Sequence, residues 1–192
     1  MCRKEGKPKI NSIVIAPSWG KSSISTKCLT CIIDHLIQND YYVYYRPHPR
    51  TLVTNKKQTQ FLLDKYPTDS FLLDTNYKDI YSLKNSEFMI SDWSGSAYEF
   101  AFFSKHPVIF IDVPKKINNH NYDQLKLVPL EESLRSKIGK IVQHDEIEKI
   151  SNILYDFRKN IDSWETTINE IKKSNVYNIG KSGSIVCDYI SV

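Results

Sequence analysis

Long apolar stretches are missing from this chain. No run of about 18 or more apolar residues occurs, which excludes a membrane-spanning helix, and residues 1–12 (MCRKEGKPKINS) lack the apolar centre of a secretory signal. We therefore expect a soluble, cytoplasmic protein.

A disulfide framework is also missing. The 192 residues contain four cysteines, and these are scattered along the chain as Cys2, Cys28, Cys31 and Cys187. A chain of this length can bury a core without cross-links, so we expect reduced thiols. Cys28 and Cys31 form a C-x-x-C pair, but no second pair or histidine cluster completes a metal site. We expect both to be core thiols on the buried stripe of a helix, and we expect no metal.

Blocks of like charge are absent. The net charge of +4 mildly favours anionic partners such as phosphates, nucleotides or a lipid surface, although basic and acidic residues are interspersed. No interleaving of aromatic and basic residues predicts nucleic-acid binding, and no carboxylate pair is placed for glycoside hydrolysis. The composition, with 41% hydrophobic and 25% charged residues, is that of a globular chain. We expect one folded domain over residues 13–192, preceded by a tail or linker remnant at 1–12.

Short apolar runs alternate with segments of helical period along the chain. Since parallel strands need crossover connections, this alternation predicts an α/β fold: a doubly wound, mainly parallel sheet with helices on both faces. A polar loop is expected at 115–126, where His120 is a weak candidate ligand contact. The expected strands are 12–16, 42–45, 70–73, 88–91 and 108–112, and the expected helices are 24–38, 55–65, 77–84, 96–104, 145–173 with a break near 162–163, and 182–190.

Three polar loops follow expected strands, at the sheet edge where ligands of open parallel sheets bind. The first only superficially resembles a phosphate-binding P-loop, because Ile15 occupies the place of its first glycine. This argues against ATPase or GTPase activity and leaves Ser18, Gly20, Lys21 and Ser22 as candidates for lining the crevice. The three loops are Pro17–Ser23 (PSWGKSS), Arg46–Thr51 (RPHPRT) and Ser91–Ser96 (SDWSGS).

The second loop concentrates cationic and titratable groups. The guanidinium groups of Arg46 and Arg50 can fork onto phosphate oxygens, and His48 can donate or accept a proton near neutrality. The flanking prolines predict a stiff, extended loop around the histidine. A solvated, proline-rich turn is the alternative, but a histidine and two arginines gathered around two prolines at the end of a strand favour a functional loop.

The third loop contains Ser94, Gly95 and Ser96 at the start of an expected helix. Unpaired backbone amides and the positive end of the helix dipole make such a position suitable for phosphate, and Gly95 permits close approach. The alternative is an ordinary N-cap, in which Ser94 or Ser96 bonds the first-turn amides and Glu99 closes a capping box. The two interpretations are compatible.

Taken together, four segments resemble the C-terminal half of the CDP-glycerol glycerophosphotransferase family, whose members build teichoic-acid-type polymers. The resemblance extends over residues 13–190. That family is similar in layout to two-domain, Rossmann-like glycosyltransferases of the GT-B type, whose C-terminal domain holds the nucleotide donor, so the resemblance implies a nucleotide-donor-binding domain at 13–192. The segments are Ile13–Gly20 (IVIAPSWG), Tyr45–Arg50 (YRPHPR), Met89–Phe100 (MISDWSGSAYEF) and Pro107–Pro114 (PVIFIDVP).

The resemblance implies roles for the second loop. His48 would lie against the donor pyrophosphate as the catalytic residue, and Arg46 and Arg50 would neutralise charge nearby. The donor would be CDP-linked or another nucleotide-linked group, the acceptor a polymer or lipid-linked hydroxyl, and no cofactor is implied. Peripheral association with the inner face of the cell membrane is a further expectation.

The resemblance also implies roles for the third loop. Ser94, Gly95 and Ser96 would give hydroxyls and amides to the phosphates, and Glu99 would face the ribose. Asp92 would fix the loop. In the family a preceding domain binds the acceptor and supplies a second histidine, so this chain is expected to need such a domain for turnover.

Two alternatives remain open at this point. The first is a glycosyltransferase or 2-epimerase that uses a nucleotide-linked sugar; an epimerase would have a second acidic residue after Glu99, where Phe100 stands. The second is a non-catalytic nucleotide-binding module, because half of a two-domain cleft is still a binding surface.

Overall fold

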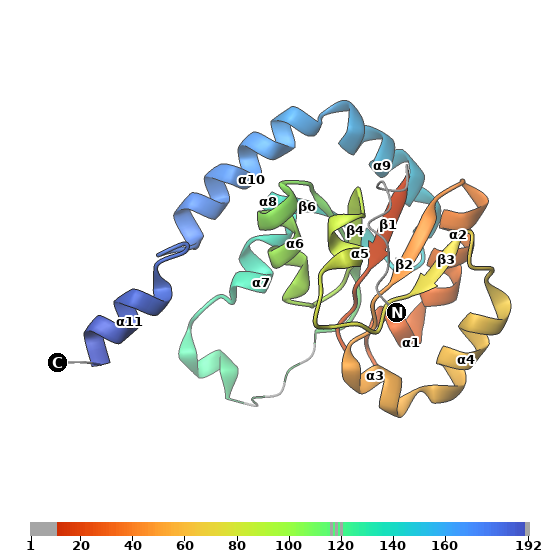
Figure 1. Cartoon of the computed structure of the whole chain (residues 1–192), viewed down its shortest axis with the longest axis horizontal. Coiled ribbons are helices and arrows are strands. Elements are labelled where there is room, and N and C mark those ends of the chain that lie inside the picture. Colours follow the sequence, from red (N-terminus) through yellow and green to blue (C-terminus); the bar gives the residue numbers. More distant parts are fainter. Residues whose placement is uncertain (1–10, 116, 118, 120, 191–192) are drawn as a thin grey trace.

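A six-stranded parallel sheet forms the centre of the molecule (Figure 1). The computed structural model describes residues 11–115, 117, 119 and 121–190. The strand order is β3-β2-β1-β4-β5-β6 and every pairing is parallel, which confirms the predicted fold class. The strands are β1 (Ser12–Ile15), β2 (Tyr42–Tyr45), β3 (Phe71–Leu73), β4 (Phe88–Ser91), β5 (Val108–Asp112) and β6 (Gly139–Gln143).

Strand β6 was not predicted. It lies at the edge of the sheet, and three of its five residues are exposed, including Ile141 at 44%. A strand that is half covered needs few apolar residues, so its sequence, GKIVQ, lacks the continuous apolar run that marks the central strands.

The predicted helices occur in order with three corrections, and three short helices, at residues 49–54, 130–133 and 135–138, were not predicted. The expected helix 24–38 is divided at Cys28, whose φ of −146° is not helical; only the last turn of 77–84 is helical; and the break near 162–163 lies at Asn160. The helices are α1 (Ile24–Lys27), α2 (Leu29–Gln38), α3 (Pro49–Thr54), α4 (Lys56–Lys65), α5 (Tyr81–Lys84), α6 (Ser96–Ser104), α7 (Leu130–Ser133), α8 (Arg135–Ile138), α9 (Ile150–Lys159), α10 (Ile161–Asn175) and α11 (Ser182–Ile190), with 3-10 turns η1 (Tyr122–Leu125) and η2 (Ile147–Lys149).

Two cores, one on each face of the sheet, follow from the period-2 alternation of the strands. In β1, Ile13 and Ile15 face one core and Val14 faces the other. The first core contains apolar side chains of α1, α2, α4 and α9, and the second contains those of α6, α8 and α10. Helix α11 contributes no buried residue to either core and extends away from the sheet (Figure 1).

The chain reverses its direction of winding between β1 and β4. It passes from β1 outward through β2 to β3 and then returns to place β4 on the other side of β1. The carboxyl ends of β1 and β4 are joined by the Ser91 hydroxyl, which donates to the carbonyl of Ala16 at 2.7 Å. Ligands of doubly wound sheets bind at such a switch point, so the fold directs attention to the loops that follow these strands.

The C-x-x-C pair does not share one buried stripe as expected. Cys28 is buried and Cys31 is exposed, because Cys28 itself interrupts the helix and Cys31 belongs to the following one. Burial raises the pKa of the Cys28 thiol to about 12, so this thiol is a core group.

Gly139 is required where β6 begins beside β5. An added Cβ would lie 1.8 Å from the backbone carbonyl oxygen of Val108. We expect Gly139→Ala to lower the free energy of unfolding by about 2 kcal/mol or more, since a backbone clash cannot be relieved by rotating a side chain. The matched control is Gly183→Ala in α11, where the added Cβ meets nothing within 4 Å. Urea denaturation measures both, and equal stability of the two variants would contradict the assigned register of β6.

His35 makes stability depend on pH. Its Nε2 lies 2.9 Å from the Ser151 hydroxyl, and burial lowers its pKa below 6.5, with Glu148 acting in the opposite direction. The unfolded chain therefore binds this proton more readily than the folded chain, so the contribution of His35 is full above pH 6.5 and is lost as pH falls towards its folded pKa. We expect the urea midpoint to fall between about pH 7.5 and 5.5, and to fall less in His35→Gln. His144→Gln, which changes an exposed histidine, should keep the wild-type pH dependence.

Candidate functional site

Asp92 fixes the loop between β1 and α1. Its carboxylate is fully buried and accepts hydrogen bonds from two backbone amides, that of Ser18 at 2.7 Å and that of Ile24 at 3.0 Å. Gly20, between them, has a φ of +108°, a left-handed conformation that favours glycine. One carboxylate from the end of β4 thus holds both ends of the loop that follows β1.

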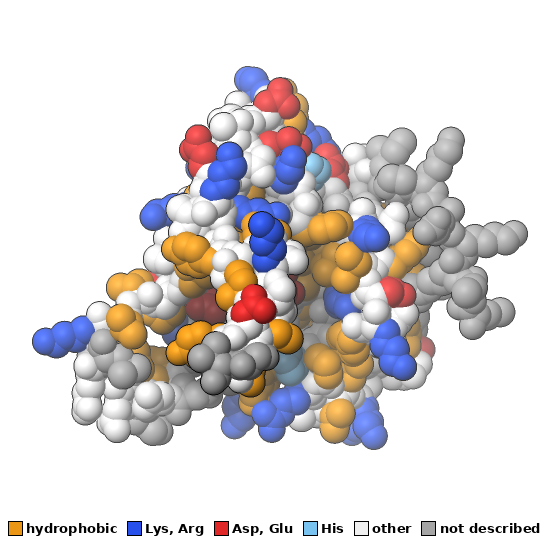
Figure 2. Space-filling model, turned by 60° about the vertical axis from the view of Figure 1, so that its left-hand side comes forward, with side chains coloured by type: hydrophobic (Ala, Val, Ile, Leu, Met, Phe, Trp, Pro, Cys, Tyr) orange, Lys and Arg blue, Asp and Glu red, His pale blue; other side chains and the backbone are white. Residues whose placement is uncertain are grey.

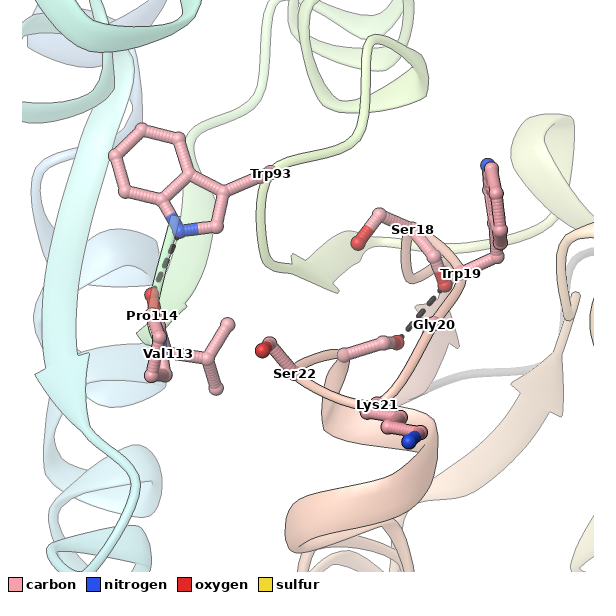
Figure 3. A pocket seen from close by; sticks show the side chains of 9 residues that line it. Ser18, Trp19, Gly20, Lys21, Ser22, Trp93, Val113 and Pro114 are labelled. Atoms are coloured by element: carbon pink, nitrogen blue, oxygen red, sulfur yellow. Dashed lines mark hydrogen bonds between the residues drawn. The ribbon is translucent and has the colours of Figure 1, made fainter. Parts of the chain in front are cut away.

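This loop forms one wall of a pocket at the switch point. Ser18 and Ser22 face Trp93, Val113 and Pro114 across the gap (Figure 3). The cavity has a volume of about 80 Å³, and the side chains of Trp19 and Lys21 point away from the gap (Figure 3). The full lining comprises Ser18, Trp19, Gly20, Lys21, Ser22, Ser23, Trp93, Val113 and Pro114.

Arg46 holds the loop that follows β3. Its Nη1 lies 2.7 Å from the buried carboxylate of Asp74 and donates to the carbonyl of Asn76, while Nη2 donates to the carbonyl of Asp79. The guanidinium also lies 5.2 Å from the centre of the Tyr77 ring. Through these contacts, Arg46 links the end of β2 to the end of β3.

His48 caps a helix instead of lying in an extended loop. It is the N-cap of α3, which begins at Pro49, and its Nδ1 accepts the backbone N–H of Arg50 at 3.1 Å. The predicted extended loop is therefore wrong beyond His48, because proline is well suited to the first turn of a helix. An Nδ1 that accepts a bond bears no proton, so the neutral ring has its proton on Nε2 and can donate from there.

Trp19 joins the first two loops. Its ring centroid lies 6.0 Å from that of His48, and the Arg50 guanidinium lies 4.1 Å from its ring centre. Arg50 is exposed, unlike Arg46. The start of α3, which contains Arg50, therefore contacts the loop that follows β1.

The start of α6 is not capped by a side chain. The Oγ atoms of Ser94 and Ser96 lie 2.8 Å apart, and no side-chain hydrogen bond is made at the N-cap, Gly95. The predicted capping box is therefore wrong. Glu99 is exposed, one helical turn further on.

The pair of serines has a consequence for hydrogen bonding. When one hydroxyl donates to the other, the second hydroxyl keeps its hydrogen for an outside acceptor. Together with the helix dipole, this arrangement suits an anion, and the first-turn amides of Ala97 and Tyr98 donate to the carbonyls of Ser94 and Gly95. Gly95 is exposed, and nothing lies within 4 Å of the position where its Cβ would be.

The surface charge is dispersed. On the face shown in Figure 2, basic side chains are interspersed with acidic and apolar ones. Any attraction of an anion therefore depends on local groups. Within residues 11–115, 117, 119 and 121–190, no three His, Cys, Asp or Glu side chains gather as a metal site would require, and no helix has the length and apolarity needed to cross a bilayer.

Three residues of the site were missed by the sequence analysis. Trp19 and Trp93 lie inside the polar loops that were singled out, so an aromatic residue in a loop after a strand was the available signal. Arg135, which stacks on Trp93 with its guanidinium carbon 3.9 Å from the ring centre, lies far along the chain and had no sequence signal. His120 lies outside the described residues.

Solved structures with similar folds include a glycosyl transferase domain, MurG and a UDP-GlcNAc 2-epimerase. The C-terminal domain of the glycosyl transferase group 1 family protein LpcC from Francisella tularensis aligns with a TM-score of 0.50 and 14% identity over 88% of this chain and 87% of that one. MurG from Acinetobacter baumannii aligns with a TM-score of 0.48 and 13% identity over 86% of this chain and 47% of that one.

The UDP-GlcNAc 2-epimerase from Methanocaldococcus jannaschii aligns with a TM-score of 0.47 and 16% identity, over 77% of this chain and 39% of that one. The chain thus spans less than half the length of the epimerase and of MurG. The likeness to LpcC shows a shared fold, that of a Rossmann-like transferase domain of the GT-B type.

The sequence itself identifies the family. No curated protein matches the chain. The family model for CDP-glycerol:poly(glycerophosphate) glycerophosphotransferases matches residues 4–191, nearly the whole length. This chain belongs to the CDP-glycerol:poly(glycerophosphate) glycerophosphotransferase family.

Proposed function

We propose that this chain is the donor-binding domain of a transferase that moves glycerophosphate from a CDP-activated polyol to an acceptor hydroxyl in cell-surface polymer synthesis. The observation that carries the proposal is the uncapped start of α6 beside the switch point, where the Ser94 and Ser96 hydroxyls meet within a chain of this family. The acceptor, a preceding acceptor-binding domain and peripheral membrane association are parts of the same proposal.

The donor pyrophosphate would lie at the N-terminus of α6. There the serine hydroxyls would supply neutral donors, and the His48 Nε2–H and the Arg50 guanidinium would contribute from the start of α3. Arg46 would stabilise this arrangement indirectly, because its ion pair with Asp74 links the ends of β2 and β3. Glu99, one turn into α6, would accept from the ribose hydroxyls.

In this reaction the site would have to stabilise the leaving group. The acceptor oxygen attacks the phosphorus that carries glycerol, the bond from that phosphorus to the bridging oxygen breaks, and CMP leaves with the electron pair. The acceptor proton passes to a base outside this chain. Negative charge grows on the departing phosphate, where donors that are already oriented stabilise the transition state most.

His48→Asn tests the histidine without removing the helix cap, because asparagine is itself a good N-cap residue. Loss of a hydrogen bond to a charged phosphate is expected to raise the dissociation constant of CDP about 10- to 100-fold. Calorimetric titration with CDP, CMP and UDP measures it. His144→Asn, at the end of the far edge strand β6, is the matched control and should bind as the wild type does.

The outcomes separate the roles. Wild-type indifference to all three nucleotides would remove the donor-site assignment. An unchanged affinity in His48→Asn would remove only the role of the histidine. A preference for UDP would favour the alternative of a nucleotide-sugar enzyme.

Ser94→Ala/Ser96→Ala tests the start of α6. Because this variant loses both hydroxyl donors but keeps the backbone amides, we expect CDP binding to weaken about 5- to 30-fold. Ser104→Ala, at the other end of the same helix, removes a hydroxyl that bonds the Phe100 carbonyl and should leave affinity unchanged. Equal affinity of the double variant and the wild type would place the phosphates elsewhere.

A further inference from the structure

Trp93 is a wall of the pocket and is held from two sides. Its indole N–H donates to the carbonyl of Val113 at 2.7 Å, which ties the end of β4 to the end of β5 (Figure 3). The guanidinium of Arg135 is stacked 3.9 Å from the ring centre, and the Lys115 ammonium lies 5.5 Å from it. A ring held by both a hydrogen bond and a stacked cation has little freedom to swing out of the pocket.

The burial of Arg135 is unfavourable for the stability of the fold. It is 3% exposed, its Nη1 lies 3.2 Å from Asp112, and its Nη2 donates to the Ile111 carbonyl at 3.4 Å. Its Nε is buried, and none of the residues that the structure describes forms a hydrogen bond with it. Burying a cation with an unsatisfied donor is unfavourable, so an apolar residue would serve the core better unless the guanidinium has another task.

The opposite wall is held by the residue next to Trp93. Asp92 binds the backbone amides of Ser18 and Ile24, so neighbouring side chains at the end of β4 fix the two sides of the pocket. The cavity volume is thus set by a rigid frame. This volume of about 80 Å³ is small beside the roughly 300–1,000 Å³ of most ligand pockets.

We propose that Arg135 positions Trp93 as a rigid wall of this pocket, and that the wall limits the group carried by the donor to a small polyol. This inference rests on the proposed function. A pyrophosphate at the start of α6 would lie close to Trp93, which precedes that helix by three residues, so the group attached to its outer phosphate can enter the pocket. The Ser18 and Ser22 hydroxyls would face polyol oxygens, and a longer polyol or a hexose would meet the indole.

The test compares how the chain binds CDP-glycerol, CDP-ribitol and CDP in calorimetry. The wild type should bind CDP-glycerol about tenfold more tightly than CDP-ribitol, and Arg135→Met should bring the two within about twofold while CDP changes little. Arg135→Lys keeps a charge over the ring without the flat stack and should recover part of the preference. A purely structural role for Arg135 would weaken all three ligands alike and leave the ratio unchanged.

Arg158→Met is the matched control. Arg158 also pairs with a carboxylate, that of Glu87, and lies 5.3 Å from the Tyr41 ring centre, but at the amino ends of β4 and β2, away from the pocket. Its loss should lower stability without altering the ratio. If Arg135→Met does not fold, Trp93→Phe provides the same measurement, because a smaller ring opens the pocket and should reduce the preference about two- to threefold.

Each outcome has one meaning. A wild type that binds CDP but shows no preference between the two polyols, or folded Arg135 and Trp93 variants that keep the full preference, would overturn this inference and leave the donor site intact. A wild type that binds no cytidine nucleotide would overturn the proposed function as well.

Discussion

The two hydrogen bonds of the Asp92 carboxylate are the interaction on which the site depends. A fully buried carboxylate is strongly disfavoured unless donors satisfy it, and here two backbone amides of the loop after β1 do so. Because the donors belong to Ser18 and Ile24, the bond pair determines the path of the whole loop. The other wall of the pocket faces that loop across the gap.

The neighbours of Asp92 extend its effect in two directions. Trp93, the next residue, forms the wall opposite the loop and is held by Arg135 and Val113. Ser94 then leads into α6, where its hydroxyl meets that of Ser96. Three consecutive residues after β4 therefore have three roles: Asp92 fixes a loop, Trp93 lines a cavity and Ser94 leads into a helix. Neighbouring residues can take these different roles because, in a parallel sheet, the end of one strand contacts the loops on both sides.

Much of the fold could be predicted from local sequence. The central strands are continuous apolar runs because both faces of a parallel sheet are buried, and this pattern is visible without a structure. The edge strand β6 and the interruption at Cys28 could not be predicted, since a half-covered strand and a single non-helical residue leave weak patterns. The capping box after Ser94 was predicted wrongly because the two serine hydroxyls bond each other, a choice that sequence spacing does not reveal.

The sequence by itself determined the alternation of strands and helices, the family, and the three polar loops that meet at one sheet edge, because apolar periodicity and turn chemistry are local properties. Only the tertiary structure decided what those loops contact. It paired Arg46 with Asp74 and left Arg50 exposed against Trp19, although the two arginines look equivalent in RPHPR. It also brought Arg135 onto Trp93 from 42 residues along the chain. Such contacts depend on how distant segments pack, and packing is a property of the whole chain.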